Sequence, residues 1–518
     1  MPGKSERARE VAALLNAAAA CYAQGRFDDA ADLYRKAATA DPKDLRPIYS
    51  LALIDIRRGR LENARQQLKT VAAQDPNFYP AQQNLGAVCQ NLNLWQEAAD
   101  AYSRALSLNP TAVETHFSLA RALAVRGRAG ESSACYRALT ANPSVRLRAL
   151  TRLAVLDPAA INEQDLIDLQ RAADDPATAS ATRIEAYFAL GVGLEERRAD
   201  QAAFSAFEAG NRLKHGALMA SADPAARPDV AEREHDLAAR FVVERFDEAF
   251  LQRAARRGST TAARGSTTAA RGSTSAARES TSAAPIFVVG MPRCGSSLIE
   301  QILSSHRDVQ SMGETAALSV VDQHLAGPEP QIHWGDLAEA YLSSMRQRGW
   351  KGADRFVDKT LENHLRVGMI HLMFPRSVIL ESTRDPIDTC LSCYRQLFTE
   401  GNETLYDLGQ IGRAYVRYRR VMEHWERVLP GRVIRVEHEK LVADPEGQIR
   451  WLVTDACKLD WDPACLRFHE TAGVVRTASA AQVRRPLFST SIGRWGRFAN
   501  ELEPLLKALG PYARGASG

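Results

Sequence analysis

The strongest constraint on the fold is a 34-residue period near the start of the chain. Gly25, Gly59, Asn93 and Gly127 are separated from one another by 34 residues each. A small residue follows each of them after five positions and a Tyr or Leu after nine: Ala30, Ala64, Ala98 and Ser132, then Tyr34, Leu68, Tyr102 and Tyr136. Small residues let paired helices approach closely, and aromatic rings fill the gap between them. The period therefore predicts a stack of helical hairpins.

Proline closes each of these units. Pro42, Pro76 and Pro110 come seventeen residues after the first three of the spaced positions, and Pro143 closes the fourth unit one residue early. Proline ends a helix, and a helix–turn–helix period of 34 residues is the tetratricopeptide signature.

Helical patterns continue at 146–156 and 163–173, and another tetratricopeptide-like pair occupies about 183–215. We therefore expect a tetratricopeptide α-solenoid over residues 11–216. The concave face of a solenoid commonly holds a peptide or a partner protein. A purely architectural role, in self-association or in shielding the neighbouring domain, is an equal alternative.

A low-complexity tract follows an apolar helical pattern near 229–250. Residues 257–284 repeat a seven-residue unit rich in Arg, Gly, Ser, Thr and Ala four times. The unit has no apolar pair larger than Ala for a coiled coil and too little apolar surface to order itself. We expect residues 217–284 to form a helix and then a tether.

Composition excludes several classes of protein. The chain has 518 residues, of which 45% are hydrophobic and 25% charged, as in soluble globular proteins. Residues 251–284 hold six Arg and one Glu, a surplus of +5, so the formal charge of +4 leaves −1 for the rest. No basic face for nucleic acid is therefore expected. No run of about 20 apolar residues exists, so no membrane span is expected.

Eight cysteines are scattered too sparsely for a disulfide scaffold. Cys390 and Cys393 form one C-x-x-C, but no second pair lies at zinc-ligand spacing, so we expect two half-buried thiols and no metal. The N-terminal segment superficially resembles a signal peptide, but Glu6 and Glu10 interrupt it and it lies in phase with the repeat. We expect a cytoplasmic protein.

Residues 285–304, PIFVVGMPRCGSSLIEQILS, predict a buried strand, a tight turn over Gly290–Gly295 and a helix opened by Ser296 and Ser297. Backbone N–H groups and the positive end of the helix dipole would then face an anion. The Walker sequence requires Lys where Ser296 stands, so Arg293 is the only cation of the loop. Its planar guanidinium suits phosphate or sulfate. An ordinary strand–helix turn with a surface Arg is the alternative for this stretch alone.

Residues 285–512 alternate strand and helix patterns. Candidate strands are 285–289, 355–358, 377–383 and 432–436, and candidate helices are about 297–304, 361–373, 386–398 and 406–428. This alternation predicts a parallel sheet with helices on both faces, a three-layer α/β/α domain.

Ligands of open α/β sheets lie beyond the carboxyl ends of the strands. Arg293, Lys359 and Arg384 follow three candidate strands, and Ser392 comes eight residues after Arg384. We therefore expect three cations at one edge of the sheet. Glu314 follows a short VQSMG segment, which we expect to return as a strand beside the loop. Its carboxylate can accept a proton from an attacking hydroxyl, or it can simply occupy a favourable helix N-terminus.

Taken together, these segments resemble a known family. GMPRCGSSLIEQILSSH with MGE, then VDKT, STRDPIDTCLSCY, VIRVEHEKLVADPE and RTASAAQVRRP…IGRW, are similar to sulfotransferases that use 3′-phosphoadenosine 5′-phosphosulfate. Bacterial tetratricopeptide sulfotransferases and tyrosylprotein sulfotransferases show this pattern. The resemblance covers about residues 285–500 and implies a P-loop-like sulfotransferase fold that needs no metal.

The resemblance implies a role for each matching residue. Residues that would hold the donor are Arg293, Cys294, Gly295, Ser296 and Ser297 at the 5′-phosphosulfate, Arg384 and Ser392 at the 3′-phosphate, and Arg494 near the nucleotide. Glu314 would be the general base on the acceptor hydroxyl. Lys359 and Ser479, together with Arg293, would stabilise charge on the transferring group and its leaving oxygen. Such an in-line transfer depends on positioning and electrostatics.

Three positions depart from the family pattern. Cys294 replaces a usual Ser and is a weaker side-chain donor. Ala316 stands where tyrosylprotein sulfotransferases have Arg, and His438 replaces a usual Tyr near the adenine. The acceptor can be a protein tyrosine, a carbohydrate hydroxyl or a small phenol, and the solenoid favours a protein or peptide.

Two other functions compete with sulfuryl transfer. A nucleotide kinase would have a similar fold, but the loop lacks the Lys that it needs. A tetratricopeptide scaffold with an inactive nucleotide-binding domain is the non-enzymatic alternative. Retention of the whole set of site residues argues against it: Arg293, Glu314, Lys359, Arg384 and Ser479.

Overall fold

A computed structural model describes residues 4–254, 283–322, 333–399, 401–470 and 492–513. The chain divides into two compact units, Met1–Ala160 and Ile161–Gly518. Ser479 and most of the predicted tether lie outside the described residues.

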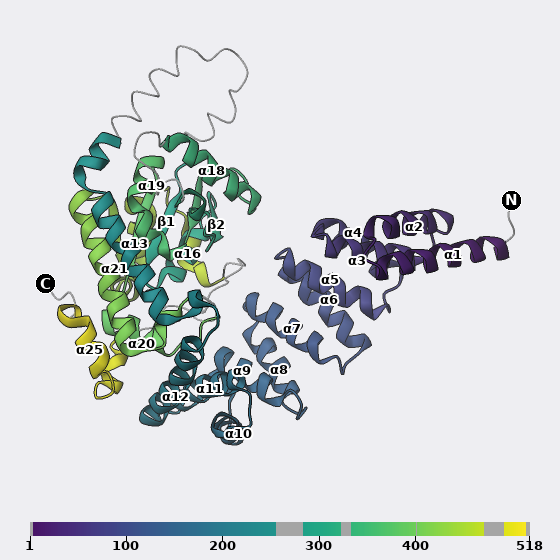
Figure 1. Ribbon diagram of the computed structural model, residues 1–518, viewed down its shortest axis with the longest axis horizontal. Coiled ribbons are helices and arrows are strands. Elements are labelled where there is room, and N and C mark those ends of the chain that lie inside the picture. The colour runs from purple at the N-terminus through teal and green to yellow at the C-terminus, as the bar shows by residue number, and fades with distance from the viewer. Residues whose placement is uncertain (1–3, 255–282, 323–332, 400, 471–491, 514–518) are drawn as a thin grey trace, which may run out of the picture. The chain divides into compact units, whose positions relative to one another are not determined.

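The first unit consists of consecutive helix pairs (Figure 1). Its helices are α1 (Lys4–Ala23), α2 (Phe27–Ala40), α3 (Leu45–Arg57), α4 (Leu61–Gln74), α5 (Tyr79–Asn91), α6 (Trp95–Leu108), α7 (Val113–Val125), α8 (Ala129–Leu139) and α9 (Arg146–Leu156). The spaced residues Gly25, Gly59, Asn93 and Gly127 occupy the turns within four pairs, with left-handed φ angles of 75°, 71°, 64° and 78°. These pairs confirm the predicted tetratricopeptide repeats.

Close packing explains why small residues recur in these helices. Ala30, Ala64, Ala98 and Ser132 are all fully buried. A Cβ atom added at Gly86 of α5 would lie 2.6 Å from the ring of Tyr102 in α6. The paired helices therefore touch with no space for a larger side chain at these positions.

The second unit combines further helices with a five-stranded sheet. The helices are α10 (Glu163–Asp174), α11 (Ser180–Glu196), α12 (Asp200–Met219), α13 (Pro228–Arg245), α16 (Ser296–Ser304), α17 (Ser319–Asp322), α18 (Trp334–Gln347), α19 (Val367–Met373), α20 (Pro386–Tyr394), α21 (Leu408–Val428), α22 (His438–Ala443), α23 (Pro445–Trp451), α25 (Glu503–Leu509) and the 3-10 helices η4 (Leu361–Arg366) and η8 (Arg494–Phe498). The strands are β1 (Ile286–Gly290), β2 (Val309–Gly313), β3 (Arg355–Asp358), β4 (Val378–Thr383) and β5 (Val433–Glu437).

The sheet is parallel, with the strand order β2-β3-β1-β4-β5. At its carboxyl edge, Gly290 pairs with Ser382 and Gly313 pairs with Asp358. The strand ends that carry the predicted site residues are therefore neighbours in space.

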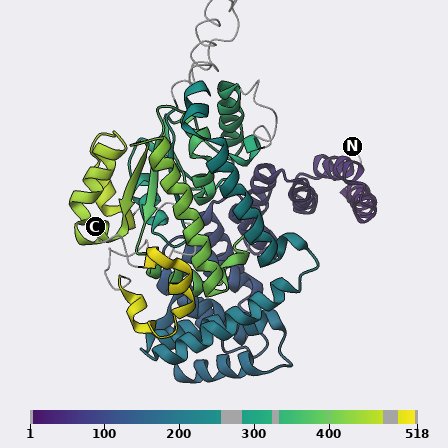
Figure 2. The ribbon, with the colours of Figure 1, turned by 60° about the vertical axis from the view of Figure 1, so that its left-hand side comes forward.

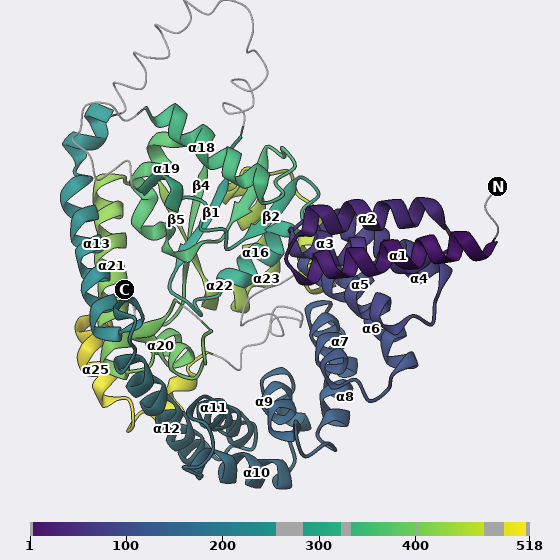
Figure 3. The ribbon, with the colours of Figure 1, turned by 45° about the vertical axis from the view of Figure 1, so that its right-hand side comes forward.

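Helices cover both faces of the sheet (Figure 3). Phe287 and Val289 of β1 pack in one core with α18, α19 and α21, whereas Ile286 and Val288 pack in another with α16 and α23. Helix α13, in teal, runs alongside α21, in light green (Figure 2). The fold class, a tetratricopeptide α-solenoid followed by a three-layer parallel-sheet domain, is confirmed.

Several element bounds differ from the prediction. The helix expected at 361–373 begins as the 3-10 helix η4, and the helix expected at 386–398 ends at Tyr394. The VQSMG segment forms β2, but this strand pairs with β3 and not with β1. Helix α18 was not predicted.

The predicted domains, 11–216, 217–284 and 285–512, remain a prediction. The boundary between the two compact units lies after Ala160, so α11 and α12 belong to the same unit as the sheet. Among the described residues, no helix is both long and apolar enough to span a membrane.

We expect Asn93→Ala to lower the free energy of unfolding by about 1 kcal/mol, because alanine tolerates the left-handed conformation poorly. Chemical denaturation measures this change. Asn91→Ala, at the exposed end of α5, is the matched control and should change stability by less than about 0.5 kcal/mol. Equal effects of the two substitutions would contradict the explanation.

Candidate active site

The loop after β1 has a backbone that only certain residues allow. Gly290 has φ 154°, and a Cβ there would lie 2.8 Å from both the Cys294 sulfur and the Ser382 carbonyl oxygen. Gly295 has φ 104°, and a Cβ there would lie 3.1 Å from Nδ1 of His438. Both glycines are therefore required by close approach as well as by backbone conformation.

Arg293 lies in this loop in a left-handed conformation, with φ 70°. Such a conformation is strained for a residue with a side chain and is typical of ligand-binding positions. Its Nε donates a hydrogen bond to Oγ of Ser392 in α20 at 3.1 Å. Burial lowers the pKa of the Arg293 guanidinium, and the positive charge of Arg384 contributes in the same direction. The structure thus brings Arg293, Ser392 and Arg384 into one neighbourhood.

Arg384 follows β4, and its side chain is only 10% exposed. Its guanidinium lies 3.9 Å from the carboxylate of Asp388, one turn along α20. Burial, with help from the charge of Arg384, lowers the pKa of His438 to about 4, so this imidazole is neutral near pH 7. Two closely placed guanidinium groups beside a neutral imidazole favour binding of an anion.

The remaining loop residues are held by buried contacts. Ser296 and Ser297 are buried at the start of α16. Ser382 donates its hydroxyl to the carbonyl oxygen of Cys294 at 3.2 Å, and burial raises the pKa of the Cys294 thiol. The position that departs from the family pattern therefore carries a protonated thiol packed against β4.

The thiols of the C-x-x-C pair are more buried than predicted. Cys390 and Cys393 are fully buried in α20, because both belong to the apolar core of the second unit, whereas we expected half-buried thiols. Cys393 donates its thiol to the carbonyl oxygen of Pro292 at 3.3 Å, and burial raises its pKa to about 12. Among the described residues, no group of three or more His, Cys, Asp or Glu is placed to hold a metal.

Lys359 lies at the end of β3 between two carboxylates. Its side chain is 1% exposed, its ammonium forms an ion pair with Glu314, and it lies 3.8 Å from Oε2 of Glu300. Ser311 donates a hydrogen bond to Glu300 at 2.6 Å. Burial raises the pKa of Glu300, although the positive charge of Lys359 opposes this shift. Glu300 was not predicted as a site residue, and its only signal in the sequence is an acidic residue within the apolar run of α16.

A buried carboxylate, that of Asp358, joins the segment that carries Glu314 to the segment that carries Lys359. Asp358 accepts hydrogen bonds from the hydroxyls of Thr315 (3.1 Å), Tyr341 (2.9 Å) and Thr360 (2.7 Å). The backbone N–H of Lys359 also donates to the carbonyl oxygen of Gly313 at 2.9 Å. Asp358 thus holds Thr315, the residue after Glu314, and Thr360, the residue after Lys359. It was not among the predicted site residues.

The predicted residues fall into groups. Arg293, Arg384 and Ser392 form one neighbourhood, and Lys359 and Glu314 form a pair. Because β3, β1 and β4 are adjacent and parallel, both groups lie at the carboxyl edge of the sheet. Arg494 forms its ion pair with Glu195 of α11, 2.7 Å away.

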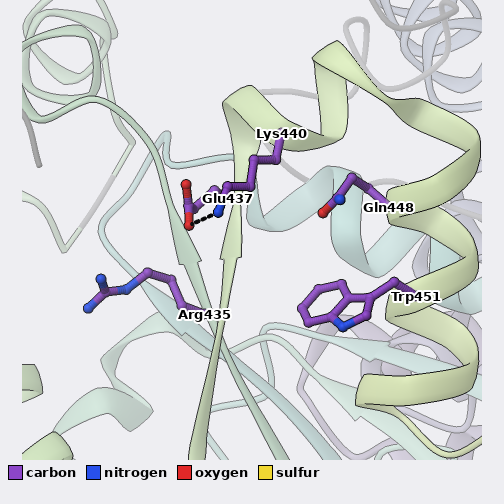
Figure 4. A pocket seen from close by; sticks show the side chains of 5 residues that line it. All are labelled: Arg435, Glu437, Lys440, Gln448 and Trp451. Atoms are coloured by element: carbon purple, nitrogen blue, oxygen red, sulfur yellow. Dashed lines mark hydrogen bonds and ion pairs between the residues drawn. The ribbon is translucent and has the colours of Figure 1, made fainter. Parts of the chain in front are cut away.

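A pocket of about 230 Å³ lies along the edge strand β5. It is lined by Arg435, Glu437, Lys440, Gln448 and Trp451, with the last two on α23 facing the strand (Figure 4). Lys440 forms an ion pair with Glu437 at 2.8 Å, and Arg435 lies 3.3 Å from the buried Glu381. Its cations are thus already paired with carboxylates, and none of the predicted site residues lines it.

Family models match two parts of the chain. Residues 285–463 match the sulfotransferase family, and residues 22–89 match the tetratricopeptide repeat. An uncharacterized protein of Aquifex aeolicus (strain VF5) is 28% identical over 485 residues, which cover 89% of this chain and 58% of that relative. The chain therefore spans little more than half the length of this relative.

A Caenorhabditis briggsae protein named "Putative protein-tyrosine sulfotransferase" is 25% identical over 248 residues, which cover 43% of this chain and 88% of that protein. The crystal structure of the MamA protein matches 40% of this chain and 93% of its own, with 18% identity and a TM-score of 0.27. The matches to the two family models and to the Caenorhabditis briggsae protein confirm the resemblance predicted from the sequence.

We expect the stability of Glu300→Gln relative to the wild type to depend on pH. Because the folded protein raises the pKa of Glu300, folding favours its protonated form, and this contribution is complete below the usual value of 4.5. It is lost as pH rises through the raised pKa, so the wild type should lose stability relative to Glu300→Gln in that range. Unfolding midpoints measured from about pH 4.5 to about pH 8 test this.

Glu446→Gln is the control, because it removes a carboxylate whose side chain is 71% exposed. A wild type that gains stability relative to Glu300→Gln as pH rises would contradict the direction of the shift.

Proposed function

We propose that residues 285–512, within which the sulfotransferase family match lies, transfer the sulfuryl group of 3′-phosphoadenosine 5′-phosphosulfate to an acceptor hydroxyl. The observation that carries this proposal is that two guanidinium groups, of Arg293 and Arg384, lie against the same helix α20 beside a glycine-bearing loop that opens a helix. An ion pair of Lys359 and Glu314 lies along the same edge of the sheet.

The donor carries anionic groups at both ends of its ribose, and the loop suits them. Backbone N–H groups at the start of α16, with Arg293, would bind the 5′-phosphosulfate. Arg384 and Ser392 would bind the 3′-phosphate. Glycine at position 295 lets His438, the residue that the resemblance places near the adenine, lie directly against the loop, because a Cβ there would be 3.1 Å from its Nδ1; this supports the fit. The buried thiol of Cys294 leaves the backbone N–H of this position unchanged.

The donor, when bound, supplies an activated sulfuryl group and a bisphosphate leaving group. Glu314 takes the proton of the acceptor hydroxyl while the acceptor oxygen bonds to sulfur and the bond from sulfur to the phosphate oxygen breaks. Lys359, with Arg293 and Ser479, stabilises the charge that develops on the transferring group and the leaving oxygen. Glu300, whose Oε2 lies 3.8 Å from the ammonium of Lys359, would hold this ammonium in place once Glu314 has taken the proton.

We propose a protein tyrosine as the acceptor, bound as a substrate or through a partner by the tetratricopeptide repeats. The name of the Caenorhabditis briggsae relative and the presence of these repeats support this choice. Ala316, with a left-handed φ of 48°, would then shape the acceptor side without the Arg of tyrosylprotein sulfotransferases.

A scaffold with an inactive nucleotide-binding domain remains the second candidate, because Cys294 and Ala316 depart from the family pattern. Incubation of the full chain with radiolabelled donor and a cell lysate distinguishes the two. Label on a protein tyrosine supports the transferase, whereas no label on any acceptor supports the scaffold.

We expect Arg293→Ala and Arg384→Ala each to weaken binding of 3′-phosphoadenosine 5′-phosphate by about ten- to a hundredfold, since each removes a charge-assisted hydrogen bond. Isothermal calorimetry measures this. Arg307→Ala is the control, because the Arg307 side chain is 66% exposed and lies beyond α16. Tighter binding of ATP than of the sulfonated nucleotide would instead indicate a kinase.

We expect Glu314→Gln to bind the nucleotide as the wild type does and to lower kcat by about a hundredfold or more, because the general base is lost. Steady-state kinetics with calorimetry of the same variant separate the two effects. Glu362→Gln, at an exposed position on η4, controls for loss of a carboxylate. Normal turnover of Glu314→Gln would exclude Glu314 as the base.

A further inference from the structure

The helical hairpin α11–α12 packs directly against the sulfotransferase-like part of the second unit (Figure 3). Asn211 of α12 donates a buried hydrogen bond to the carbonyl oxygen of Tyr394 at 2.8 Å. The ring of Phe204 lies 5.8 Å from the rings of both Tyr394 and Phe498. The hairpin therefore contacts two separate segments, the end of α20 and the 3-10 helix η8.

A buried carboxylate at the end of α11 joins the same two segments. The side chain of Glu195 is 2% exposed, and its Oε1 lies 2.7 Å from Nη2 of Arg494 in η8. Its other oxygen forms an ion pair with Arg395, the residue after α20. One carboxylate is thus placed between two guanidinium groups, away from solvent, where the attraction between charges is strong.

The segment around Arg494 is tied to the proposed 3′-phosphate site by a second carboxylate. The backbone N–H groups of Gly493 and Trp495, on either side of Arg494, donate to Asp388 at 2.6 and 3.1 Å. Asp388 in turn lies 3.9 Å from the guanidinium of Arg384. The backbone of Arg494 is therefore fixed to α20, and its side chain is fixed to α11.

We propose that Glu195 is a positioning residue of the donor site, which orients Arg494 toward the 3′-phosphorylated nucleotide. This inference rests on the proposed function and assigns to the hairpin α11–α12 a part in donor binding. Without a carboxylate between them, Arg395 and Arg494 would repel each other, and Arg494 would lose the partner that restricts its side chain. The hairpin would thus complete the donor site, in addition to any role in binding a partner.

The test uses the full chain and a matched pair of variants. Glu195→Gln removes the buried carboxylate, whereas Glu196→Gln removes the exposed charge that follows it in α11. We expect Glu195→Gln to weaken binding of 3′-phosphoadenosine 5′-phosphate by about tenfold or more, because a small displacement of a binding group has effects of this size. The charge of Glu196 also acts on Arg494, but from an exposed position where solvent screens it, so Glu196→Gln should stay within about twofold of the wild type. Equal affinities of the two variants would overturn the inference.

A double-mutant cycle tests whether Glu195 acts through Arg494. If it does, Glu195→Gln should have little further effect on affinity in an Arg494→Gln background. Full additivity of the two losses would overturn this route. In steady-state kinetics, Glu195→Gln should raise the KM for the donor and leave the KM for the acceptor unchanged, a split that general loss of structure would not produce.

Glu195→Asp keeps the charge and covers the case in which Glu195→Gln does not fold. It should weaken nucleotide binding relative to Glu196→Asp, because the shorter side chain cannot reach both guanidinium groups, and equal binding would overturn the inference. Absence of nucleotide binding by the wild type would refute the proposed function itself. Binding by the wild type and by Glu195→Gln with equal affinity would refute only the role of Glu195.

Discussion

The gathering of positive charge at the carboxyl edge of the sheet is the constraint on which the rest of the second unit depends. Parallel strands β3, β1 and β4 end side by side, so the residues that follow them meet. Burial lowers the pKa of the Arg293 guanidinium and the charge of Arg384 acts in the same direction, since buried like charges are unfavourable without anionic partners. Carboxylates therefore surround this edge, and Asp388, Glu300 and Glu314 each lie beside one of its cations.

Local chemistry explains which features could be predicted from the sequence. The 34-residue period was visible because each turn needs a left-handed residue, and Asn93 meets that need as the glycines do. Arg293 and Ser392 are 99 residues apart, but their proximity could be predicted, because a parallel sheet brings the carboxyl ends of its strands together. The Arg293 loop itself was predicted from a strand, a glycine turn and a helix start that adjoin in sequence.

Contacts that depend on tertiary packing left no comparable signal. Glu300, Asp358 and Glu195 are charged residues on otherwise ordinary stretches, and only the folded chain shows that Asp358 and Glu195 are buried and that Glu300 is only 12% exposed. Glu195 and Arg395 are 200 residues apart, and no periodicity or strand order links them. The family resemblance covers residues 285–500 and therefore gave no information about α11 and α12. Their assignment to the solenoid up to residue 216 rested on the helical pattern alone.

The buried ionic contacts are better explained by geometry than by stability. A buried ion pair gives little net stabilisation, because desolvation of the charges offsets most of their attraction. Asp358 and Glu195 are nevertheless buried, each with its polar partners around it. These carboxylates orient their neighbours. Asp358 holds the segments of Lys359 and Glu314, and Glu195 holds the side chain of Arg494. Charges held in place before a ligand binds need no reorganisation during transfer, and preorganisation of this kind is the main source of electrostatic catalysis.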